Sequence, residues 1–335
     1  MNFLHKRKFN ILVLGSDGML GHDVMEHFTK KSHRRDSNVG IVAGINRADK
    51  IDFETPRDLV DFLDRSIKFD FCINCIAMTD TRKAEESVDG RISSFYLNAL
   101  YPKVIAEVCA AKNIKLIHIS TDWVFSELTL QGINTAFLPI DEPVPANVYG
   151  FHKLQGETYV TNVMNAAKCQ DLYMVFRVSW LYGNHKKKSF VHKIILNAVK
   201  SLTKGDATLE VTANEVSIPT STAFVCDRIE HAISDWKFEV KRGNIKHCVC
   251  AKLSAGFTRA EFATVVLNNA SLYTDLLDGK QLSEVKIIPV DRDSYWPKYS
   301  VMHSSWMYGD AISFLNSFLH RHGAEIIKWA KAQCS

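Results

Sequence analysis

The stretch ILVLGSDGMLGHDV, residues 11–24, decides the fold. Its apolar start predicts a buried strand, and glycines follow at a spacing of three residues. Glycine lets the backbone turn tightly and approach a pyrophosphate, whose charge then lies at the N-terminus of the next helix. Because the loop follows a strand and precedes a helix, it predicts a dinucleotide site, with a ligand-free glycine turn as the alternative. The expected cofactor contacts here are Gly15, Gly18, Met19, Leu20 and Gly21.

Short apolar runs alternate with amphipathic stretches through the first half of the chain. Continuous apolar strands separated by helices predict a parallel sheet covered on both faces, the doubly wound α/β (Rossmann) arrangement. Strands are expected at 9–15, 39–45, 70–77, 115–120 and 173–179, and helices at 18–31, 56–66, 91–112 and 149–168.

The end of the second expected strand bears on the choice of dinucleotide. An acid at that point would bond the ribose 2′-hydroxyl of NAD, whereas an arginine would pair with the 2′-phosphate of NADP. The sequence there is GINRADK, with Asn46 and Arg47 and no acid at the strand end. This pattern favours NADPH, and a plain solvated charge is the alternative for Arg47. Asp52 is either a contact of the adenine edge or a simple turn aspartate.

The regular alternation loosens after about residue 180. We expect an NADP-binding Rossmann domain over 8–180, with return segments near 215–250. A smaller, partly interleaved C-terminal substrate-binding lobe is expected from 181–214 and 251–335, with helices at 189–204, 258–269 and 308–332 around the short strand VKIIPV.

The bulk composition is that of an ordinary globular protein, with 46% apolar and 23% charged residues and a net charge of +4. This mild charge calls for neither a nucleic-acid nor a membrane partner. The apolar run after the basic start is too short for a signal peptide, and no stretch approaches the roughly 18–20 apolar residues of a membrane span. We expect a cytoplasmic protein whose eight cysteines are reduced and structural, and no metal site. The oligomeric state stays open, with a homodimer as one option.

Two tyrosines are followed by a lysine four positions later: Tyr149 and Lys153 in NVYGFHKLQGE, and Tyr182 and Lys186 in YGNHK. On a helix such a pair shares one face, and an ammonium group beside a phenol stabilises the phenolate of a proton donor. The spacing alone does not distinguish the two pairs.

The sequences around the two tyrosine–lysine pairs distinguish them. Upstream of Tyr149, LIHISTDWVF predicts a strand ending at Ser120 and Thr121, and ligands of open α/β sheets bind at such carboxyl ends. Tyr149 itself opens a helix after DEPVPAN. Tyr182 lies in a glycine-bearing loop before three lysines, which is typical of a solvated surface. We therefore assign Tyr149 as the proton donor.

A series of further motifs carries a family resemblance. They are AMTDTRKAEES (77–87), LNA (97–99), STDWVF (120–125), FRVSWLYG (176–183) and NEVSIPT (214–220). With the glycine loop and NVYGFHKLQGE, the chain resembles the extended short-chain dehydrogenase/reductases, and within them the dTDP-4-dehydrorhamnose reductase family. The motifs stand in the family's order over most of residues 10–225, which is far more specific than any one of them.

The resemblance implies an NADPH-dependent reduction of the C4 ketone of a nucleotide-linked 4-keto-6-deoxyhexose, in L-rhamnose nucleotide synthesis. It implies that Tyr149 protonates the C4 oxygen, that Lys153 binds the nicotinamide ribose and lowers the tyrosine pKa, and that Thr121 orients the ketone. Donors must be aimed where charge develops on oxygen. Ser120 is the alternative to Thr121. Asn98 supports a proton relay or bonds a neighbouring strand. Ala77 is a further expected cofactor contact, and the expected substrate contacts are Thr79, Thr121, Asp122, Val124, Arg177, Trp180, Pro219, Trp296 and Lys298. A structural pair with an acid is the alternative for Arg177, and a role in the geometry of the lobes is the alternative for Pro219.

Two departures concern the substrate side. The family segment R-P-x-x-S-x-L-D reads WPKYSVMH here, so Trp296 replaces an arginine near the diphosphate and His303 replaces an aspartate. Trp296 would stack on a base or belong to the core, and Lys298 would supply the missing charge. Arg82 also stands where the family often has aspartate. The nucleotide and the exact sugar therefore stay open.

Two other functions share these motifs. One is another extended short-chain dehydrogenase acting on a nucleotide sugar, such as an epimerase or an epimerase/reductase, because fold does not fix reaction. The other is a non-catalytic NADP-binding regulatory subunit of the methionine adenosyltransferase type. The presence of Tyr149, Lys153 and Thr121 argues against the regulator, which need not keep all three.

Overall fold

The computed structural model describes residues 8–51, 54–126, 135–185, 189–250, 256–273, 280–291, 296–306 and 310–334. The chain divides into two compact units, each built from three separate segments. Unit 1 holds residues 1–124, 147–177 and 226–246, and unit 2 holds 125–146, 178–225 and 247–335. The contacts thus group 125–146 with unit 2, whereas the sequence-based division kept this segment in the first domain.

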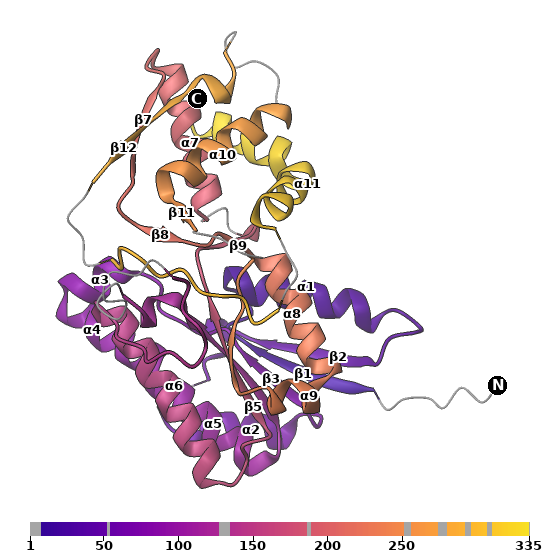
Figure 1. Cartoon of the computed structure of the whole chain (residues 1–335). Coiled ribbons are helices and arrows are strands. Elements are labelled where there is room, and N and C mark those ends of the chain that lie inside the picture. Colours follow the sequence, from indigo (N-terminus) through magenta and orange to yellow (C-terminus); the bar gives the residue numbers. More distant parts are fainter. Residues whose placement is uncertain are drawn as a thin grey trace. The chain divides into compact units, whose positions relative to one another are not determined.

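Unit 1 is built on a six-stranded sheet in the order β10-β5-β4-β3-β1-β2 (Figure 1). β1 pairs in parallel with β2 and with β3, and β3 pairs in parallel with β4. The chain leaves β1 on one side for β2 and on the other for β3, so the strand order reverses beside β1, where open α/β sheets bind ligands. The strands are β1 (Phe9–Leu14), β2 (Val39–Ile45), β3 (Phe71–Asn74), β4 (Lys115–Thr121), β5 (Tyr173–Val178) and β10 (Ile245–His247).

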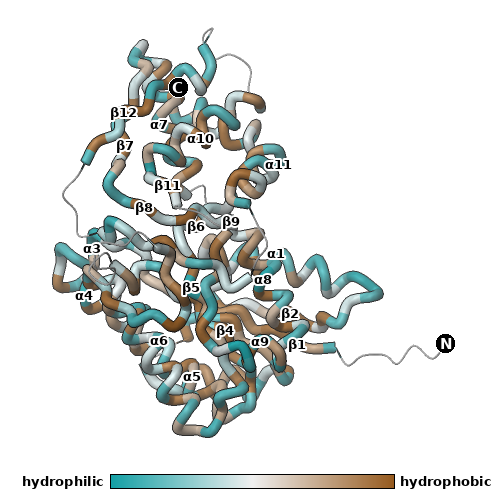
Figure 2. The backbone as a smooth tube through the Cα atoms, in the orientation of Figure 1, coloured by the Kyte–Doolittle hydropathy of each residue, from teal (hydrophilic) through white to brown (hydrophobic). Residues whose placement is uncertain are grey.

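Helices cover both faces of this sheet, as predicted. On one face α2, α5 and α6 close a core with the apolar strand residues, such as Leu12 and Leu116 (Figure 2 shows these strands as hydrophobic). On the other face α9 packs Trp236 edge-on against Phe71 of β3, and α1 is tied to α8 through Glu230. The helices are α1 (Met19–Ser32), α2 (Pro56–Arg65), α3 (Thr81–Glu86), α4 (Val88–Phe95), α5 (Tyr101–Lys112), α6 (Val148–Ala166), α8 (Thr222–Ser234) and α9 (Trp236–Lys241).

The expected helix 91–112 is interrupted rather than continuous. It comprises the end of α4, a π-helical turn at Tyr96–Leu100, and α5. Because of this turn, the backbone oxygen of Asn98 lies only 2.2 Å from the position that a Cβ on Gly156 of α6 would occupy. Only glycine therefore fits where the two segments cross. π-Helical turns are frequent at functional sites.

Unit 2 has its own apolar core, formed mainly by α7, α10 and α11 with Tyr182 and Val211. Its elements are β6 (Leu181–Tyr182), α7 (Phe190–Thr203), β7 (Thr208–Thr212), β8 (Val216–Ser217), β9 (Thr220–Ser221), β11 (Phe257–Thr258), α10 (Arg259–Ala270), β12 (Lys286–Val290) and α11 (Ala311–Ala332). The three helices and β12 lie close to their expected ranges.

Among the described residues, no helix is both long enough and apolar enough to cross a membrane.

Candidate functional site

The glycine loop after β1 depends on two glycines for steric reasons. Gly15 has φ +78°, a left-handed conformation, and a Cβ on it would lie 3.0 Å from the backbone of Cys75 after β3. A Cβ on Gly21 would lie 2.1 Å from the backbone oxygen of Gly15. Larger side chains at either position would push the loop away from the sheet or from α1, so this tight turn requires glycine.

The first turn of α1 is suited to a phosphate. Gly18 is its N-cap and provides no side-chain cap, and the first turn contains no acid. Amide groups of a helix N-terminus then face an anion together with the positive end of the helix dipole. The turn contains the predicted contacts Met19 and Leu20. The residues present therefore fit a dinucleotide pyrophosphate.

Asn46 and Arg47 lie directly after β2, as predicted. Asn46 Oδ1 accepts a hydrogen bond from the Ala48 backbone amide at 2.8 Å, and the backbone amide of Asn46 donates to Asp49 Oδ2 at 2.7 Å. This capping box fixes a short 3₁₀ turn, Arg47–Asp49, and leaves the Arg47 side chain exposed. An exposed guanidinium on a fixed turn is available to a phosphate. Asp52 lies outside the described residues.

Tyr149 and Thr121 come together at the carboxyl end of β4. The first turn of α6 is fixed at both sides, because Asn147 Oδ1 accepts the Gly150 amide at 2.8 Å and Glu85 Oε2 accepts the Val148 amide at 2.9 Å. The Tyr149 side chain lies beside that of Thr121, whose hydrogen bonding lowers the pKa of the phenol. The Tyr149 ring also packs edge-on against Trp123 at 5.5 Å. The predicted donor thus lies beside the predicted strand-end hydroxyl.

The neighbouring predicted residues of STDWVF are buried. Asp122 is 2% exposed, and Thr121 Oγ1 donates to its Oδ1 at 3.2 Å. Val124 is fully buried. Burial raises the pKa of Tyr149 to about 12; the hydrogen bond with Thr121 lowers it and the charge of Asp122 raises it. The phenol is therefore protonated at neutral pH.

Lys153 lies one turn further along α6 and is 1% exposed. Its Nζ donates to the backbone oxygen of Ile119 at 2.6 Å. Burial lowers the pKa of this lysine to about 8, against the opposing effects of Glu157 and Cys75. The implied lowering of the Tyr149 pKa by Lys153 is not among the causes that act on the tyrosine. In this structure the Lys153 ammonium group is hydrogen-bonded to the backbone of β4.

Arg177, an expected substrate contact, forms a buried ion pair with Glu157 of α6. Its Nη2 lies 2.8 Å from Glu157 Oε2, and its Nε lies 3.0 Å from Oε1. Ser120 donates to the same Oε1 at 2.5 Å. This leaves Thr121 as the strand-end hydroxyl beside Tyr149. The sequence reasoning missed Glu157, although it follows Lys153 at one helical turn within the quoted NVYGFHKLQGE.

Asn98, on the π-helical turn, holds the segment after β3. Its Oδ1 accepts the Met78 amide at 3.0 Å, and its Nδ2 donates to Met78 oxygen at 3.1 Å and to Ser94 Oγ at 3.0 Å. The predicted contacts Ala77 and Thr79 flank Met78; Ala77 is partly buried and Thr79 exposed. The Asn98 side chain therefore positions this segment.

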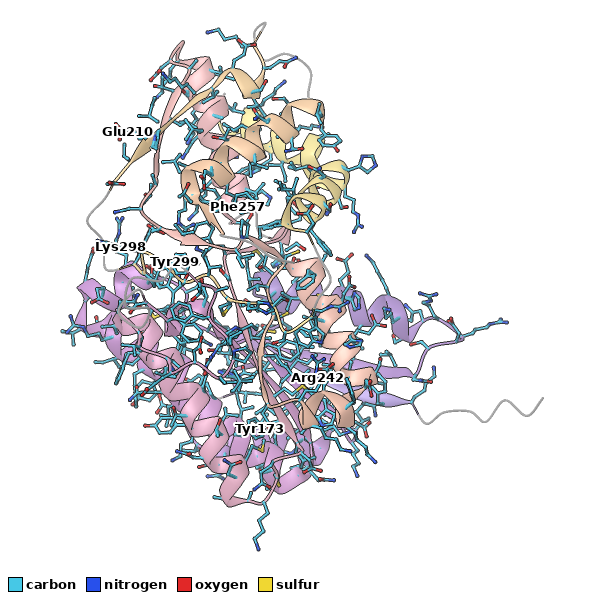
Figure 3. The ribbon with its side chains drawn as sticks, viewed as in Figure 1. Tyr173, Glu210, Arg242, Phe257, Lys298 and Tyr299 are labelled. Atoms are coloured by element: carbon cyan, nitrogen blue, oxygen red, sulfur yellow. The ribbon has the colours of Figure 1, made fainter. Side chains whose placement is uncertain are left out.

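In unit 2 the two substrate motifs lie side by side. The Val216 amide donates to the Lys298 oxygen at 2.8 Å, and the Ser300 amide donates to the Val216 oxygen at 3.0 Å. Figure 3 labels Lys298 and Tyr299 on this segment, and the Lys298 side chain is exposed. Pro219 of the first motif is buried.

Arg259, which the sequence reasoning missed, connects the predicted tryptophans. Its guanidinium lies 4.2 Å from the ring centre of Trp180 and 5.4 Å from that of Trp296, within the range of cation–π contact. Its Nε donates to the buried Glu215 of NEVSIPT at 2.7 Å. Trp180 itself has φ +34°, an uncommon conformation for a non-glycine residue. The only sequence signal was its place directly after a helix-capping threonine, Thr258.

The prediction of a solvated surface around Tyr182 is wrong. Tyr182 is 1% exposed and packs against Phe262 and Phe318 in the core of unit 2. Its apolar neighbours in sequence, rather than the following lysines, decide its position. Lys186 lies outside the described residues.

All eight cysteines lie in the described part of the chain and none forms a disulfide. Two groups of potential metal ligands occur there, both involving α1: His22 with Asp23 and Glu26, and His27 with Asp227 and Glu230. Lys31 Nζ lies 2.5 Å from Glu230, so a cation of the chain already pairs with the second group. The absence of a metal site stays a prediction.

Comparisons with known proteins find similar sequences among nucleotide-sugar reductases. A dTDP-4-dehydrorhamnose reductase of Mycolicibacterium smegmatis is 32% identical over 212 residues, covering 63% of this chain and 56% of that protein. A dTDP-4-keto-6-deoxy-D-glucose reductase of Streptomyces niveus is 27% identical over 302 residues, covering 88% and 89%. The matched region spans about half the length of the first curated relatives.

A solved structure shares the fold. It is a dTDP-4-dehydrorhamnose reductase from Bacillus anthracis in complex with NADP, with a TM-score of 0.74 and 21% identity over 94% of this chain and 99% of that one. The family model described as the RmlD substrate binding domain matches residues 9–319. By that match, which extends over most of its length, the chain belongs to the RmlD substrate binding domain family.

Proposed function

We propose that the protein is an NADPH-dependent reductase of the C4 ketone of a nucleotide-linked 4-keto-6-deoxyhexose. The observation that carries the proposal is the placement of Tyr149 against Thr121 at the carboxyl end of β4, with Lys153 one turn along the same helix. Membership of the RmlD substrate binding domain family and relatives named as 4-ketoreductases support the same reaction.

NADPH, when bound, supplies the hydride. In unit 1 the glycine loop, the first turn of α1 and Arg47 would hold it, and Lys153 would hydrogen-bond its ribose. Thr121 would turn its one hydroxyl proton from Asp122 to the ketone oxygen and orient the ketone. Tyr149 gives its proton to that oxygen as negative charge develops there.

In unit 2 we assign recognition of the nucleotide sugar to the group formed by Trp180, Arg259 and Trp296, with Pro219 and Lys298 on the adjoining motifs. Aromatic faces suit a base and cations suit a diphosphate. The proposal includes action in the cytoplasm, with neither nucleic acid nor membrane as partner. A homodimer is one oligomeric state that sedimentation would distinguish.

The test is an NADPH-consumption assay with purified full-length protein and a panel of UDP-, dTDP- and GDP-linked 4-keto-6-deoxyhexoses. Turnover with at least one of them, and none with the corresponding 4-hydroxy sugars, is the expected result. Isomerisation of a nucleotide sugar without net NADPH consumption would instead identify an epimerase. Tight NADPH binding with no turnover of any sugar would identify a regulatory subunit.

A further inference from the structure

Glu157 is a buried carboxylate of unit 1 to which the reaction as described gives no role. It lies on the same face of α6 as Tyr149 and Lys153, two turns and one turn after them. It is 3% exposed, and both of its oxygens are bonded: Oε1 accepts from Ser120 and from Arg177 Nε, and Oε2 accepts from Arg177 Nη2. The carboxylate is thereby fixed against the ends of β4 and β5.

The groups around Lys153 come from four elements. Glu157 is on its own helix, Cys75 follows β3, His118 is on β4, and Arg177 is on β5. His118 is fully buried, and burial together with the charge of Lys153 holds its pKa well below the usual range, so this imidazole is neutral. Burial raises the pKa of the Cys75 thiol to about 12, so that group is neutral as well. Of these four groups around Lys153, Glu157 is the one that carries a negative charge.

The buried cluster therefore holds two cations, Lys153 and Arg177, against one carboxylate. Buried charges are costly unless they are paired. Glu157 raises the pKa of Lys153, which burial has lowered to about 8. Without the carboxylate the lysine would lose its proton nearer neutral pH, and a neutral amine would no longer present a positive charge to the proton donor or three hydrogen-bond donors to a ribose.

We propose that Glu157 is a positioning residue, whose carboxylate keeps Lys153 in its ammonium form while Ser120 and Arg177 hold that carboxylate in place. The inference rests on the proposed function for its consequence in catalysis. The electrostatic relation between the two side chains does not depend on which sugar is reduced.

The experiment compares three variants of the full-length protein. Glu157→Gln removes the charge and keeps the shape, Glu157→Asp keeps the charge, and Ser120→Ala removes one hydrogen bond to the carboxylate but leaves its charge. The Lys153 titration is followed by NMR in protein labelled with ¹³C at the lysine ε-carbon, with Lys153→Arg to assign the signal. The pH profile of kcat/KM for NADPH is measured in parallel.

In Glu157→Gln we expect the Lys153 midpoint and the alkaline limb of the profile to move to lower pH together, by roughly one unit, the shift that one nearby opposite charge produces. Glu157→Asp should restore both toward the wild-type values. Ser120→Ala should lower thermal stability and leave the Lys153 midpoint in place. An unchanged midpoint in Glu157→Gln, or an equal shift in Ser120→Ala, would overturn the proposal.

Removing one partner of a buried ion pair can prevent folding, whereas replacing both is better tolerated. If Glu157→Gln does not fold, the double variant Glu157→Gln/Arg177→Gln, which removes both partners of the ion pair, is measured instead. It should fold and show a lower Lys153 midpoint than Arg177→Gln, in which the same cation is missing and the carboxylate remains; equal midpoints in these two variants would refute the proposal. If no sugar is turned over, the proposed function is refuted. The midpoint of the Lys153 titration, measured by NMR, still decides the role of Glu157.

Discussion

Tyr149 is protonated at neutral pH, as any phenol is, and burial raises its pKa further, to about 12. A general acid must be protonated when the substrate oxygen gains charge, and Tyr149 meets this condition, although the raised pKa makes its proton harder to give. The hydrogen bond with Thr121 acts in the opposite direction and stabilises the phenolate that forms once the proton has left. Donor and hydroxyl thus work as one unit.

Replacement of Tyr149 by Phe removes the proton donor and little else. We expect turnover to fall by about 100-fold or more, the usual contribution of a positioned general acid, while the dissociation constant for NADPH stays close to wild type. Stopped-flow NADPH oxidation and fluorescence titration measure the two quantities. Tyr182→Phe is the matched control, because Tyr182 lies in the core of unit 2. Wild-type turnover in the Tyr149→Phe variant would contradict the assignment.

The pH dependence should follow Lys153. Its pKa is lowered to about 8, so the ammonium form dominates below that pH and the neutral amine above it. In the proposed reaction the ammonium form binds the cofactor ribose, so kcat/KM for NADPH should be level at neutral pH and fall as the pH rises past about 8. This parameter reports ionisations of the free enzyme. A profile that stays level to about pH 10, the range of an unperturbed lysine, would contradict this account.

The sequence predicted on which helix or strand the main site residues lie, but not which side chains they contact. Tyr149 opens a helix and Thr121 ends a strand, as predicted, because prolines and an apolar run mark those boundaries. The Arg177–Glu157 pair depends on which helix face meets β5, and the stacking of Arg259 on Trp180 depends on unit 2 folding back on itself. Such pairings are tertiary and have no local signal. For Tyr182 a local signal was present but misleading. The lysines that follow it suggested a solvated surface, whereas its ring is buried in the core of unit 2.

At the scale of elements, we propose that the 3₁₀ turn after β2 sets the preference for NADPH over NADH. The capping box of Asn46 fixes Arg47 at the strand end. Arg47→Asp should weaken NADPH relative to NADH by about 10- to 100-fold, the equivalent of one or two charge-assisted hydrogen bonds. Fluorescence titration with both cofactors measures the ratio. Arg34→Asp, which changes an exposed arginine just after α1, is the charge-matched control. If both variants leave the ratio unchanged, Arg47 is a solvated charge.

The long elements of unit 1 were predictable because each has a clear period and a boundary signal. β3 ended earlier than expected, at Asn74, where the Asn74 side chain accepts the Ile76 amide and turns the chain. α8 was not predicted, although Val225, Ile229 and Ile233 recur at helical spacing, and neither were the two-residue strands β8 and β9 that precede it. Elements of two residues are too short for any periodicity.

At the scale of the whole molecule, neither unit is a continuous stretch of chain. Unit 1 takes β10, α9 and most of α8 from residues 226–246. Trp236 of that segment donates to the Asp171 oxygen at 2.7 Å, and the Val175 amide donates to the Asn244 oxygen at 2.8 Å. The sheet therefore includes chain from beyond residue 180, within the range near 215–250 where return segments are expected.

A chain ending at residue 180 should fail to form a stable cofactor-binding domain. It would leave the edge of β5 unpaired and Phe71 uncovered, which favours aggregation. Circular dichroism melting and NADPH titration, with the full chain in parallel, test this. A truncated chain that melts cooperatively and binds NADPH as the full chain does would show that unit 1 does not need residues 226–246.

The central claim is transfer of hydride from NADPH to C4 of a nucleotide-linked ketosugar with a proton from Tyr149. NADPH deuterated at nicotinamide C4, reacted with the sugar found active in the panel, tests it most directly. Mass spectrometry and NMR of the product should find the deuterium on C4 of the hexose in the wild type, and Tyr149→Phe should form this labelled product about 100-fold or more slowly. Deuterium on another carbon, or a labelled C4 formed at the wild-type rate without Tyr149, would contradict the account.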